Sequence, residues 1–416
     1  MILEVFLAVR RASGGREARA AAPRTRAKGA RRHGRGQDER RGMTNRIRLA
    51  TIGTSPISDN LLEAAREVSD VEYVGTLSRD AGRARAFTEA HGGTRPFTSL
   101  EQLASCPDVD AVYVASPNAA HVAQALELAS AGKHLLVEKP LCANRYDAQR
   151  LFAAAELHGV VVMEAMRPLH DPAWRAIAAA LPSIGRLRRA TLRFGRYSSR
   201  FDELKAGRQT NIFDARMASG ALMDMGVYTV EPMVALFGMP ERVTAATTLV
   251  AEKGNELTGG AIDGAGSVLC AYGEDSGTPG LVVELSYSKI TTDLLPSQFE
   301  GDLGTVTVDS PSIPQSASVL HRGRAVRGDA RAVATSVGDR HERLDVRPCA
   351  NSMVYELRDF VRLVRDEPLD TLWGPALDAR GAQASFRDVT LDALAVTDEI
   401  RRQAGIEFPA DVPAEA

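Results

Sequence analysis

The chain has few cysteines and aromatic residues, and it lacks any long apolar run. Aromatic residues make up 5% of its 416 residues, and its four cysteines, Cys106, Cys142, Cys270 and Cys349, show no CxxC spacing. That pattern argues against a disulfide framework or a zinc site and fits the reduced thiols of a cytoplasmic protein. None of the eight histidines belongs to an HExxH pair, so the sequence gives no support for a catalytic metal. No apolar run approaches the ~18 residues that a membrane-spanning helix needs.

Positive charge is concentrated at the N-terminus. Residues 1–42 carry 12 Lys or Arg and four Asp or Glu, whereas the rest of the chain carries 39 and 49. The body is therefore acidic, which argues against a nucleic-acid-binding body. We expect residues 1–45 to be a disordered basic extension, because they are rich in Arg, Ala and Gly and lack hydrophobic periodicity. No apolar region follows Arg10 and Arg11 as an export signal requires. We favour the interpretation that translation begins at Met43. The alternative is that the basic extension is a nucleic-acid-binding tail.

The length suggests two domains, or one domain with a large appendage, and the first part has a clear pattern. Over residues 46–166, short apolar runs alternate with amphipathic segments. This alternation predicts right-handed crossovers and a doubly wound parallel sheet of the Rossmann type. The expected strands are Ile47–Gly53, Tyr73–Ser78, Ala111–Ser116, His134–Lys139 and Val160–Ala165.

After residue 166 the pattern changes to strands rich in β-branched residues. We expect residues 167–350 to form an α+β domain with a large, mostly antiparallel open sheet, used for substrate binding and oligomerisation. An open sheet usually needs a partner surface, so a homo-oligomer, dimer or tetramer, is expected. Residues 351–416 are predicted to be C-terminal helices that pack back on the body. The helical patterns lie at 217–237, 353–365 and 376–403.

The turn after the first strand is typical of a dinucleotide site. It reads GTSPIS and keeps only Gly53 of the usual three glycines, with Ser55 and Ser58 at the other two positions. Small residues still allow the backbone to approach a pyrophosphate at a helix N-terminus. Gly53, Thr54, Ser55 and Ile57 are therefore candidate cofactor contacts. An ordinary strand-to-helix turn is the alternative.

The ends of the second and third strands carry further candidates. Ser78 and Arg79 stand where a NAD-preferring site places Asp or Glu. A hydroxyl and a guanidinium suit a 2'-phosphate, so NADP is favoured over NAD. Alternatively, Arg79 is a solvated residue beside a helix cap at Asp80.

After the third strand, the adenine or nicotinamide side of the cofactor is expected to contact Ser116, Pro117, Asn118 and His121. His121 could equally be a capping or packing histidine.

The fourth strand ends in HLLVEKP. Glu138, Lys139 and Pro140 stop an apolar run at the carboxyl edge of the sheet, where open parallel sheets bind ligands. Beside apolar walls, the Lys139 ammonium is expected to be partly desolvated, with its pKa lowered toward working pH. A solvated surface pair is the alternative.

Four segments together resemble the Gfo/Idh/MocA oxidoreductase family. They are GTSPIS at 53–58, SPNAAH at 116–121, EKP at 138–140 and SGALMDMGVY at 219–228. The resemblance covers about residues 46–411. The tyrosine at the end of the last motif is similar to the branch with glucose-fructose oxidoreductase, dihydrodiol dehydrogenase and NADP-dependent xylose dehydrogenase. This resemblance implies NADP dependence, a cis peptide bond before Pro140 and a small polyhydroxy substrate.

Two positions depart from that branch. Ser219 stands where the branch often has glycine, and Arg167 stands where dihydrodiol dehydrogenases tend to have an aromatic residue, so their substrates are not carried over. Arg167 is a candidate for the cofactor side and for substrate contact, together with Asn211 and Asp214.

The resemblance also implies a mechanism. Asp224 and Tyr228 are four residues apart, so they share one face of a helix; an exposed pair is the alternative. We expect Tyr228 to act as base in oxidation and acid in reduction, with its phenolic pKa lowered by Lys139. Lys139 would stabilise the alkoxide, Asp224 would orient the hydroxyl, and Glu138 would contact the nicotinamide ribose.

The sequence thus predicts a cytoplasmic NAD(P)-dependent dehydrogenase or reductase acting on CH–OH groups of a sugar, cyclitol or related compound. It predicts no metal, no membrane and no nucleic-acid partner. The alternative is a non-catalytic NAD(P)-sensing regulatory protein of the same fold.

Overall fold

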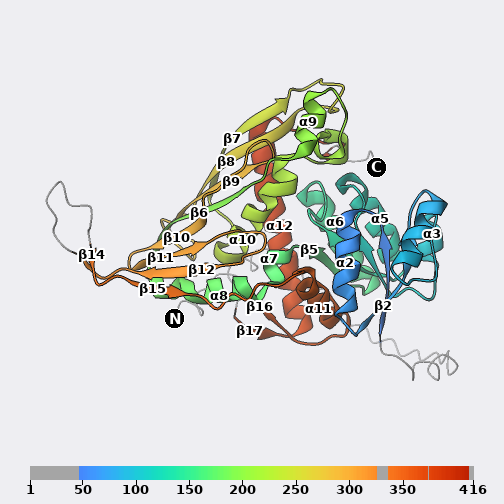
Figure 1. Cartoon of the computed structure of the whole chain (residues 1–416), viewed down its shortest axis with the longest axis horizontal. Helices are drawn as coiled ribbons and strands as arrows, with labels where there is room; N and C mark the ends of the chain where they lie inside the picture. The colour runs from blue at the N-terminus through green and yellow to red at the C-terminus, as the bar shows by residue number, and fades with distance from the viewer. Residues whose placement is uncertain (1–45, 326–335, 373, 412–416) are drawn as a thin grey trace, which may run out of the picture.

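The computed structural model describes residues 46–325, 336–372 and 374–411 (Figure 1). These residues form a parallel sheet and a larger, mostly antiparallel sheet, as the sequence predicted. The expected basic extension, residues 1–45, lies outside the described residues. Within the described ranges, no helix is both long and apolar enough to cross a bilayer.

The first sheet has five parallel strands in the order β2-β1-β3-β4-β5. Every residue of β3 is buried, as expected when helices cover both faces of a parallel sheet. The strands are β1 Ile47–Ile52, β2 Val71–Leu77, β3 Ala111–Val114, β4 His134–Glu138 and β5 Val162–Ala165. The helices are α2 Pro56–Arg66, α3 Ala81–Ala90, α4 Leu100–Ala104, α5 Asn118–Ser130 and α6 Arg145–His158. The strand order reverses between β1 and β3, and ligands of open parallel sheets bind at such a switch point.

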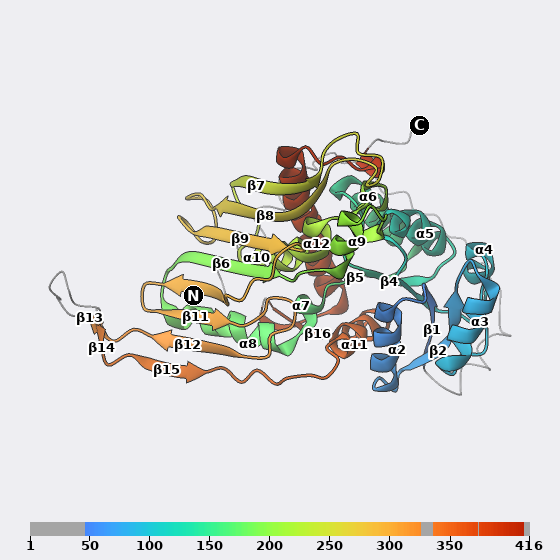
Figure 2. The same ribbon diagram turned by 45° about the horizontal axis from the view of Figure 1, so that its top comes forward.

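The second sheet has the order β15-β12-β11-β10-β6-β9-β8-β7. Its pairs are antiparallel except for β6 and β9, which run parallel. Helices α10 and α12 lie along one face (Figure 2). The other face leaves large side chains such as Leu269 and Val282 exposed. The strands are β6 Leu187–Gly195, β7 Arg242–Ala251, β8 Ile262–Ala271, β9 Val282–Ser288, β10 Ser297–Gly301, β11 Gly304–Val308, β12 Ala317–His321 and β15 Arg340–Arg343. Two small hairpins add β13 Arg324–Ala325 with β14 Ser336–Val337, and β16 Leu369–Thr371 with β17 Gly374–Leu377.

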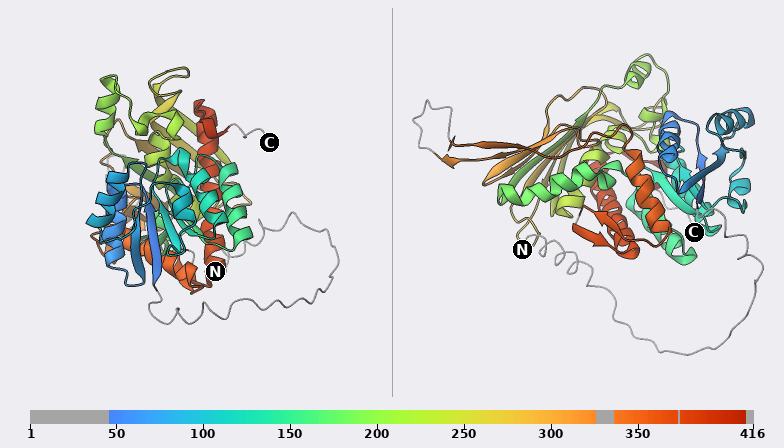
Figure 3. Two further views of the ribbon diagram at one scale, coloured as in Figure 1. Left: turned by 90° about the vertical axis from the view of Figure 1, so that its right-hand side faces the viewer. Right: turned by 60° about the horizontal axis from the view of Figure 1, so that its bottom comes forward.

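Several helices in this half were missed by the sequence interpretation. Asp171 accepts a hydrogen bond from the Ala173 N–H and Pro172 occupies the first helical turn, a start signal that was overlooked. The α-helices are α7 Arg167–His170, α8 Pro172–Ala180, α9 Ser199–Lys205, α10 Val227–Phe237, α11 Met353–Val364 and α12 Ala379–Ala404. The 3-10 turns are η2 Leu181–Ile184, η3 Asn211–Phe213, η4 Ala215–Met217 and η6 Pro409–Asp411. Figure 3 shows the C-terminal helices, drawn in orange and red, on one side of the large sheet.

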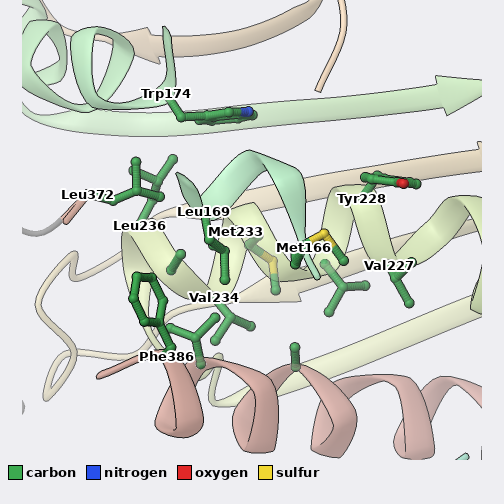
Figure 4. Packing of buried hydrophobic residues seen from close by; sticks show 14 of the residues in the cluster. Met166, Leu169, Trp174, Val227, Tyr228, Met233, Val234, Leu236, Leu372 and Phe386 are labelled. Carbon is green, nitrogen blue, oxygen red and sulfur yellow. The ribbon is translucent and has the colours of Figure 1, made fainter. Parts of the chain in front are cut away.

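Packing against α12 and the large sheet holds α10 in place. Figure 4 shows Tyr228 at one end of a buried cluster that includes Trp174, Met233 and Phe386. The Trp174 indole is fully buried and donates its N–H to the Pro311 carbonyl at 3.0 Å. Because α10 is fixed between the large sheet and α12, the side chains at its N-terminal end have defined positions.

The continuous helix expected at 217–237 is interrupted. Ala218 and Gly220 have φ angles of 51° and 119°, and a π-helical turn, η5 Leu222–Gly226, precedes α10. The Leu222 N–H is donated to Asp263 Oδ2 at 2.7 Å, so it has left the helical pattern. A π-helical turn of this kind often marks a functional site.

We expect Asp263 to make stability depend on pH. Burial raises the pKa of Asp263 to about 7, whereas in the unfolded chain the carboxyl loses its proton near pH ~4. Between these values the native state binds more protons, so stability falls as pH rises through this window, by about 1.4 kcal/mol per unit. Asp263→Asn keeps an acceptor oxygen and removes this dependence.

Urea unfolding at pH 5 and pH 8 measures the effect. The free energy of unfolding of the variant minus that of the wild type should be roughly 2–3 kcal/mol larger at pH 8 than at pH 5. If the difference in free energy of unfolding between the two proteins is the same at both pH values, the raised pKa of Asp263 is contradicted.

Candidate active site

A cavity of about 1220 Å³ lies at the carboxyl edge of the parallel sheet, facing β6, η5 and α10. Most of the residues that the sequence singled out line it, from both halves of the chain. They are Gly53, Thr54, Ser55, Ile57, Ser78, Arg79, Ser116, Pro117, Asn118, Glu138, Lys139, Arg167, Asn211, Asp224 and Tyr228.

The turn between β1 and α2 is shaped to admit a phosphate. Gly53 has φ 104°, and a Cβ there would lie 2.7 Å from the Ala115 carbonyl oxygen, so a larger residue does not fit. Ser55 is the N-cap of α2, but its side chain makes no capping hydrogen bond, and the buried Ser58 Oγ has no partner. Ser55 and Ile57 line the cavity at the positive end of α2, where anions bind.

The end of β2 presents cations to the same cavity. Arg79 and Arg83 line it together with Ser78. Asp80 caps α3 by accepting the Arg83 N–H at 2.8 Å, as the alternative reading proposed. Arg79 nevertheless faces the cavity, so a capping Asp80 and a ligand-facing Arg79 occur together.

His121 does not line the cavity, which corrects the expectation of a cofactor contact. Its ring is fully buried, with one nitrogen 2.8 Å from the Ser116 carbonyl oxygen and the other 3.1 Å from that of Pro140. Burial lowers its pKa. His121 therefore packs between the loop after β3 and the loop at Pro140, whose peptide bond with Lys139 is cis.

Asp214 also lies away from the cavity. Its side chain is fully buried, where it accepts hydrogen bonds from Arg216 at 2.8 Å and Gln209 at 2.7 Å. The interpretation of Asp214 as a substrate contact is therefore wrong. Arg216 and Asn211 line the cavity in that region.

At the centre of the site, Asp224 is held between two ammonium groups. Lys139 Nζ lies 3.0 Å from Asp224 Oδ1 and 2.9 Å from its backbone carbonyl oxygen. Lys289 Nζ contacts Oδ2. Lys139 Nζ also lies 4.7 Å from the centroid of the Tyr228 ring, within the range of a cation–π contact. Lys139 and Tyr228 are therefore adjacent in a part of the site where both are nearly buried.

These contacts set charges that differ from the sequence expectation. Burial would lower the pKa of Lys139, but Asp224, Tyr228 and Glu138 raise it above its ordinary value. Burial would raise the pKa of Asp224, but Lys139 and Lys289 hold it well below its ordinary value. The site therefore contains an ammonium and a carboxylate. The expectation that the Lys139 pKa falls toward working pH is wrong, because a carboxylate faces the ammonium.

The phenol of Tyr228 also differs from expectation. Burial raises its pKa above the ordinary value, although Lys139 and Arg167 lower it. Tyr228 is only 6% exposed, so desolvation of the phenolate outweighs the neighbouring cations. The resting side chain is consequently a neutral phenol and a proton donor.

Sequence reasoning missed Lys289, which immediately follows β9. A lysine after a strand end was the available signal, but nothing in the sequence indicated that it would reach Asp224.

Buried carboxyl groups support the loop that carries Lys139. Glu164 accepts the Leu141 N–H and the Thr390 hydroxyl, both at 2.7 Å. Burial and the neighbouring Glu164 raise the pKa of Glu231 well above its ordinary value. The two adjacent carboxyl groups therefore resist carrying two negative charges, and the hydrogen bonds of Glu164 tie β5, the loop after Pro140 and α12 together.

Glu138 is buried beside this loop. It accepts hydrogen bonds from the Tyr113 hydroxyl and, at 3.2 Å, from the Lys139 N–H. Among the described residues, no group of three or more His, Cys, Asp or Glu is arranged to hold a metal ion.

Two family models match this chain. Residues 47–166 match the model described as an oxidoreductase family with an NAD-binding Rossmann fold, and residues 178–293 match the GFO/IDH/MocA C-terminal domain.

Curated relatives match over most or part of the chain. The chain is 33% identical over 365 residues to scyllo-inositol 2-dehydrogenase (NADP(+)) from Bacillus subtilis, covering 88% of this chain and 99% of that one. It is 32% identical over 181 residues to trans-1,2-dihydrobenzene-1,2-diol dehydrogenase from Oryctolagus cuniculus, covering 42% and 53%.

Solved structures share the fold. A 3-ketoreductase from Actinomadura kijaniata, in complex with NADP and TDP-benzene, superposes with a TM-score of 0.67 at 23% identity, covering 86% of this chain and 98% of that one. An aldose-aldose oxidoreductase from Caulobacter crescentus gives a TM-score of 0.67 at 17% identity, with the same coverage.

Proposed function

Because the chain belongs to the Gfo/Idh/MocA oxidoreductase family, we propose that it is an NADP-dependent oxidoreductase. It transfers a hydride between the nicotinamide cofactor and a hydroxyl or carbonyl group of a sugar, cyclitol or related polyhydroxy compound. The observation that carries this proposal is the contact of Lys139 with both Asp224 and Tyr228 in a cavity that continues to the turn at Gly53.

The residues at the parallel sheet fit a dinucleotide. The α2 N-terminus, Gly53, Thr54, Ser55 and Ile57 would hold the pyrophosphate. One side of the cofactor would contact Ser116, Pro117 and Asn118. Glu138 would bind the nicotinamide ribose. All four residues line the cavity. Bound NADP would supply the acceptor or donor of the hydride.

Ser78, Arg79 and Arg83 would hold the 2'-phosphate, since no acidic residue at the end of β2 lines the cavity among the described residues. Replacing Arg79 with serine should weaken NADPH binding roughly 10- to 100-fold, the loss expected for a charge-assisted hydrogen bond, and leave NADH binding unchanged.

Titrations of NADPH and NADH fluorescence measure this change. Arg85→Ser, at an exposed position of α3 outside the cavity lining, is the matched control. Equal weakening of both cofactors by Arg79→Ser would count against a 2'-phosphate contact.

The chain's own residues would move the proton. In reduction, the neutral Tyr228 phenol donates its proton to the substrate oxygen as the carbonyl carbon becomes CH–OH. In oxidation, the phenolate accepts that proton as the CH–OH carbon becomes a carbonyl. The Lys139 ammonium stabilises negative charge on the substrate oxygen and on the phenolate. Asp224 fixes the position of Lys139 and orients the hydroxyl.

The relatives guide the choice of substrate and cofactor. An NADP-dependent inositol dehydrogenase matches over nearly its whole length, and a D-xylose 1-dehydrogenase (NADP(+)) from Haloferax volcanii is 32% identical over 199 residues. We further propose that the chain works in the cytoplasm as a homo-oligomer, using the open face of the large sheet.

Titration of NADPH against NADH, followed by a screen of polyols, inositols and aldoses at saturating cofactor, tests the function. We expect tighter NADPH binding and cofactor-linked turnover of at least one compound. Absence of cofactor binding would overturn the proposal. Tight binding without any turnover would favour a non-catalytic sensor.

A further inference from the structure

The cavity lining is strongly basic. Six of the described lining residues are Lys or Arg, and two, Glu138 and Asp224, are acidic. The six basic residues are Arg79, Arg83, Lys139, Arg167, Arg196 and Arg216. A neutral substrate and a dinucleotide phosphate do not account for all of them.

Most of these charges have a counterpart. Asp224 is shared by Lys139 and Lys289, and Arg216 is paired with Asp214. Arg79 follows β2 and Arg83 lies in the first turn of α3, on the side proposed for the 2'-phosphate. Of the remaining cavity cations among the described residues, Arg167 and Arg196 make no hydrogen bond or ion pair through their guanidinium groups.

The first of them is Arg167, at the start of α7. Its guanidinium is close enough to Tyr228 to lower the pKa of that phenol. Glu356 lies behind it, fully buried, with neither carboxyl oxygen hydrogen-bonded. Burial raises the pKa of Glu356 well above its ordinary range, so Glu356 is a weak counter-charge for Arg167. Burial would lower the pKa of Arg167, but Tyr228 and Glu138 also raise it.

The second is Arg196, which follows β6. Its guanidinium lies 5.3 Å from the centroid of the Phe194 ring, and the Phe194 ring meets the Tyr228 ring edge-on at 5.3 Å. Arg196 is therefore held by an aromatic face next to the proposed proton donor. Its five N–H donors remain available to a ligand.

Two guanidinium groups beside one reacting centre are suited to bind an anionic group of the substrate. Guanidinium matches carboxylate and phosphate oxygens in paired hydrogen bonds, and it is more weakly hydrated than an ammonium. Arg167 lies near Tyr228, and Arg196 lies over Phe194, whose ring contacts Tyr228. An anion bound by both arginines would therefore lie near the reacting carbon.

We propose that the substrate is a polyhydroxy compound carrying an anionic group, a carboxylate or a phosphate monoester, which Arg167 and Arg196 bind beside the hydroxyl that faces Tyr228. This inference rests on the proposed function and narrows its substrate class.

Matched sets of compounds test the proposal. Each set contains a neutral member, its sugar acid and its phosphate monoester, for example glucose, glucuronate and glucose 6-phosphate. Turnover is measured with NADP, and binding to the NADPH complex is measured by calorimetry, so that members that do not react are also compared. At least one anionic class should exceed its neutral counterpart by at least ~10-fold in kcat/KM or affinity, and the class that does so identifies the group.

Variants show whether the two arginines cause the preference. Arg196→Gln and Arg167→Gln should each reduce the advantage of the anionic member roughly 10- to 100-fold, as expected for loss of a charge-assisted hydrogen bond. Arg200→Gln, on the exposed surface of α9 and outside the cavity lining, is the matched control and should leave the advantage unchanged.

Three results would overturn the inference. They are neutral members that bind or react as well as their anionic counterparts, arginine variants that affect both classes equally, and anionic members that do not bind at millimolar concentration. Turnover of neutral compounds with NADP would still support the proposed function, whereas absent cofactor binding would reject that function itself.

Discussion

Replacing Tyr228 with phenylalanine should lower kcat by at least ~100-fold, the usual contribution of a positioned proton donor or acceptor. The change removes only the hydroxyl, so the packing of the ring against Phe194 and its contact with Lys139 remain possible. NADPH affinity should stay within about threefold of the wild-type value, since none of the proposed cofactor contacts is made by the Tyr228 hydroxyl. Steady-state kinetics in both directions, with a fluorescence titration of NADPH, measure both quantities.

Tyr197→Phe is the matched control for this variant. Tyr197 is exposed, lies outside the cavity lining, and donates its hydroxyl hydrogen to Asp202 Oδ1 at 2.7 Å. Its turnover should equal that of the wild type. A Tyr228→Phe protein that keeps near-normal turnover would remove Tyr228 from the proposed chemistry.

Replacing Lys139 with methionine should also lower kcat by at least ~100-fold. The ammonium would no longer stabilise negative charge on the substrate oxygen, a loss that commonly amounts to 10²–10³-fold for one preorganised donor. Because Lys139 lowers the pKa of Tyr228, its removal should raise that pKa further and slow oxidation more than reduction. Comparison of kcat in the two directions measures this asymmetry.

Methionine preserves most of the volume of Lys139, and Asp224 keeps its contact with Lys289, so the fold should be retained. Lys253→Met removes an exposed lysine paired with Glu407 and is the matched control. Retention of more than a third of wild-type kcat by Lys139→Met would be incompatible with the assigned role.

The parallel half of the fold and the residues at its strand ends could be read from the sequence. Parallel strands align their carboxyl ends at one edge, so Gly53, Arg79 and Lys139 were placed together without knowledge of contacts. The same reasoning could not place Lys289, because its position depends on how β9 pairs within an eight-stranded sheet.

The chemistry of the site depended on burial and on distant partners, which local sequence does not show. The phenol of Tyr228 was expected to be acidified by Lys139, but its desolvation in the core outweighs that effect. The π-helical turn at Asp224 depends on Asp263 in β8 accepting the Leu222 N–H. His121 had two open readings, and its buried hydrogen bonds to the Ser116 and Pro140 carbonyls support packing.

The pH dependence of oxidation in the wild type and in Tyr228→Phe tests most directly the claim that Tyr228 carries the proton. Because the pKa of Tyr228 lies above its ordinary value, the reactive phenolate is a minor form at neutral pH, and its fraction grows about tenfold per pH unit. Wild-type kcat/KM for oxidation should therefore rise with pH toward pH ~10, while reduction stays nearly level. The residual oxidation rate of Tyr228→Phe should lack that rise. The same slope in both proteins would contradict the account.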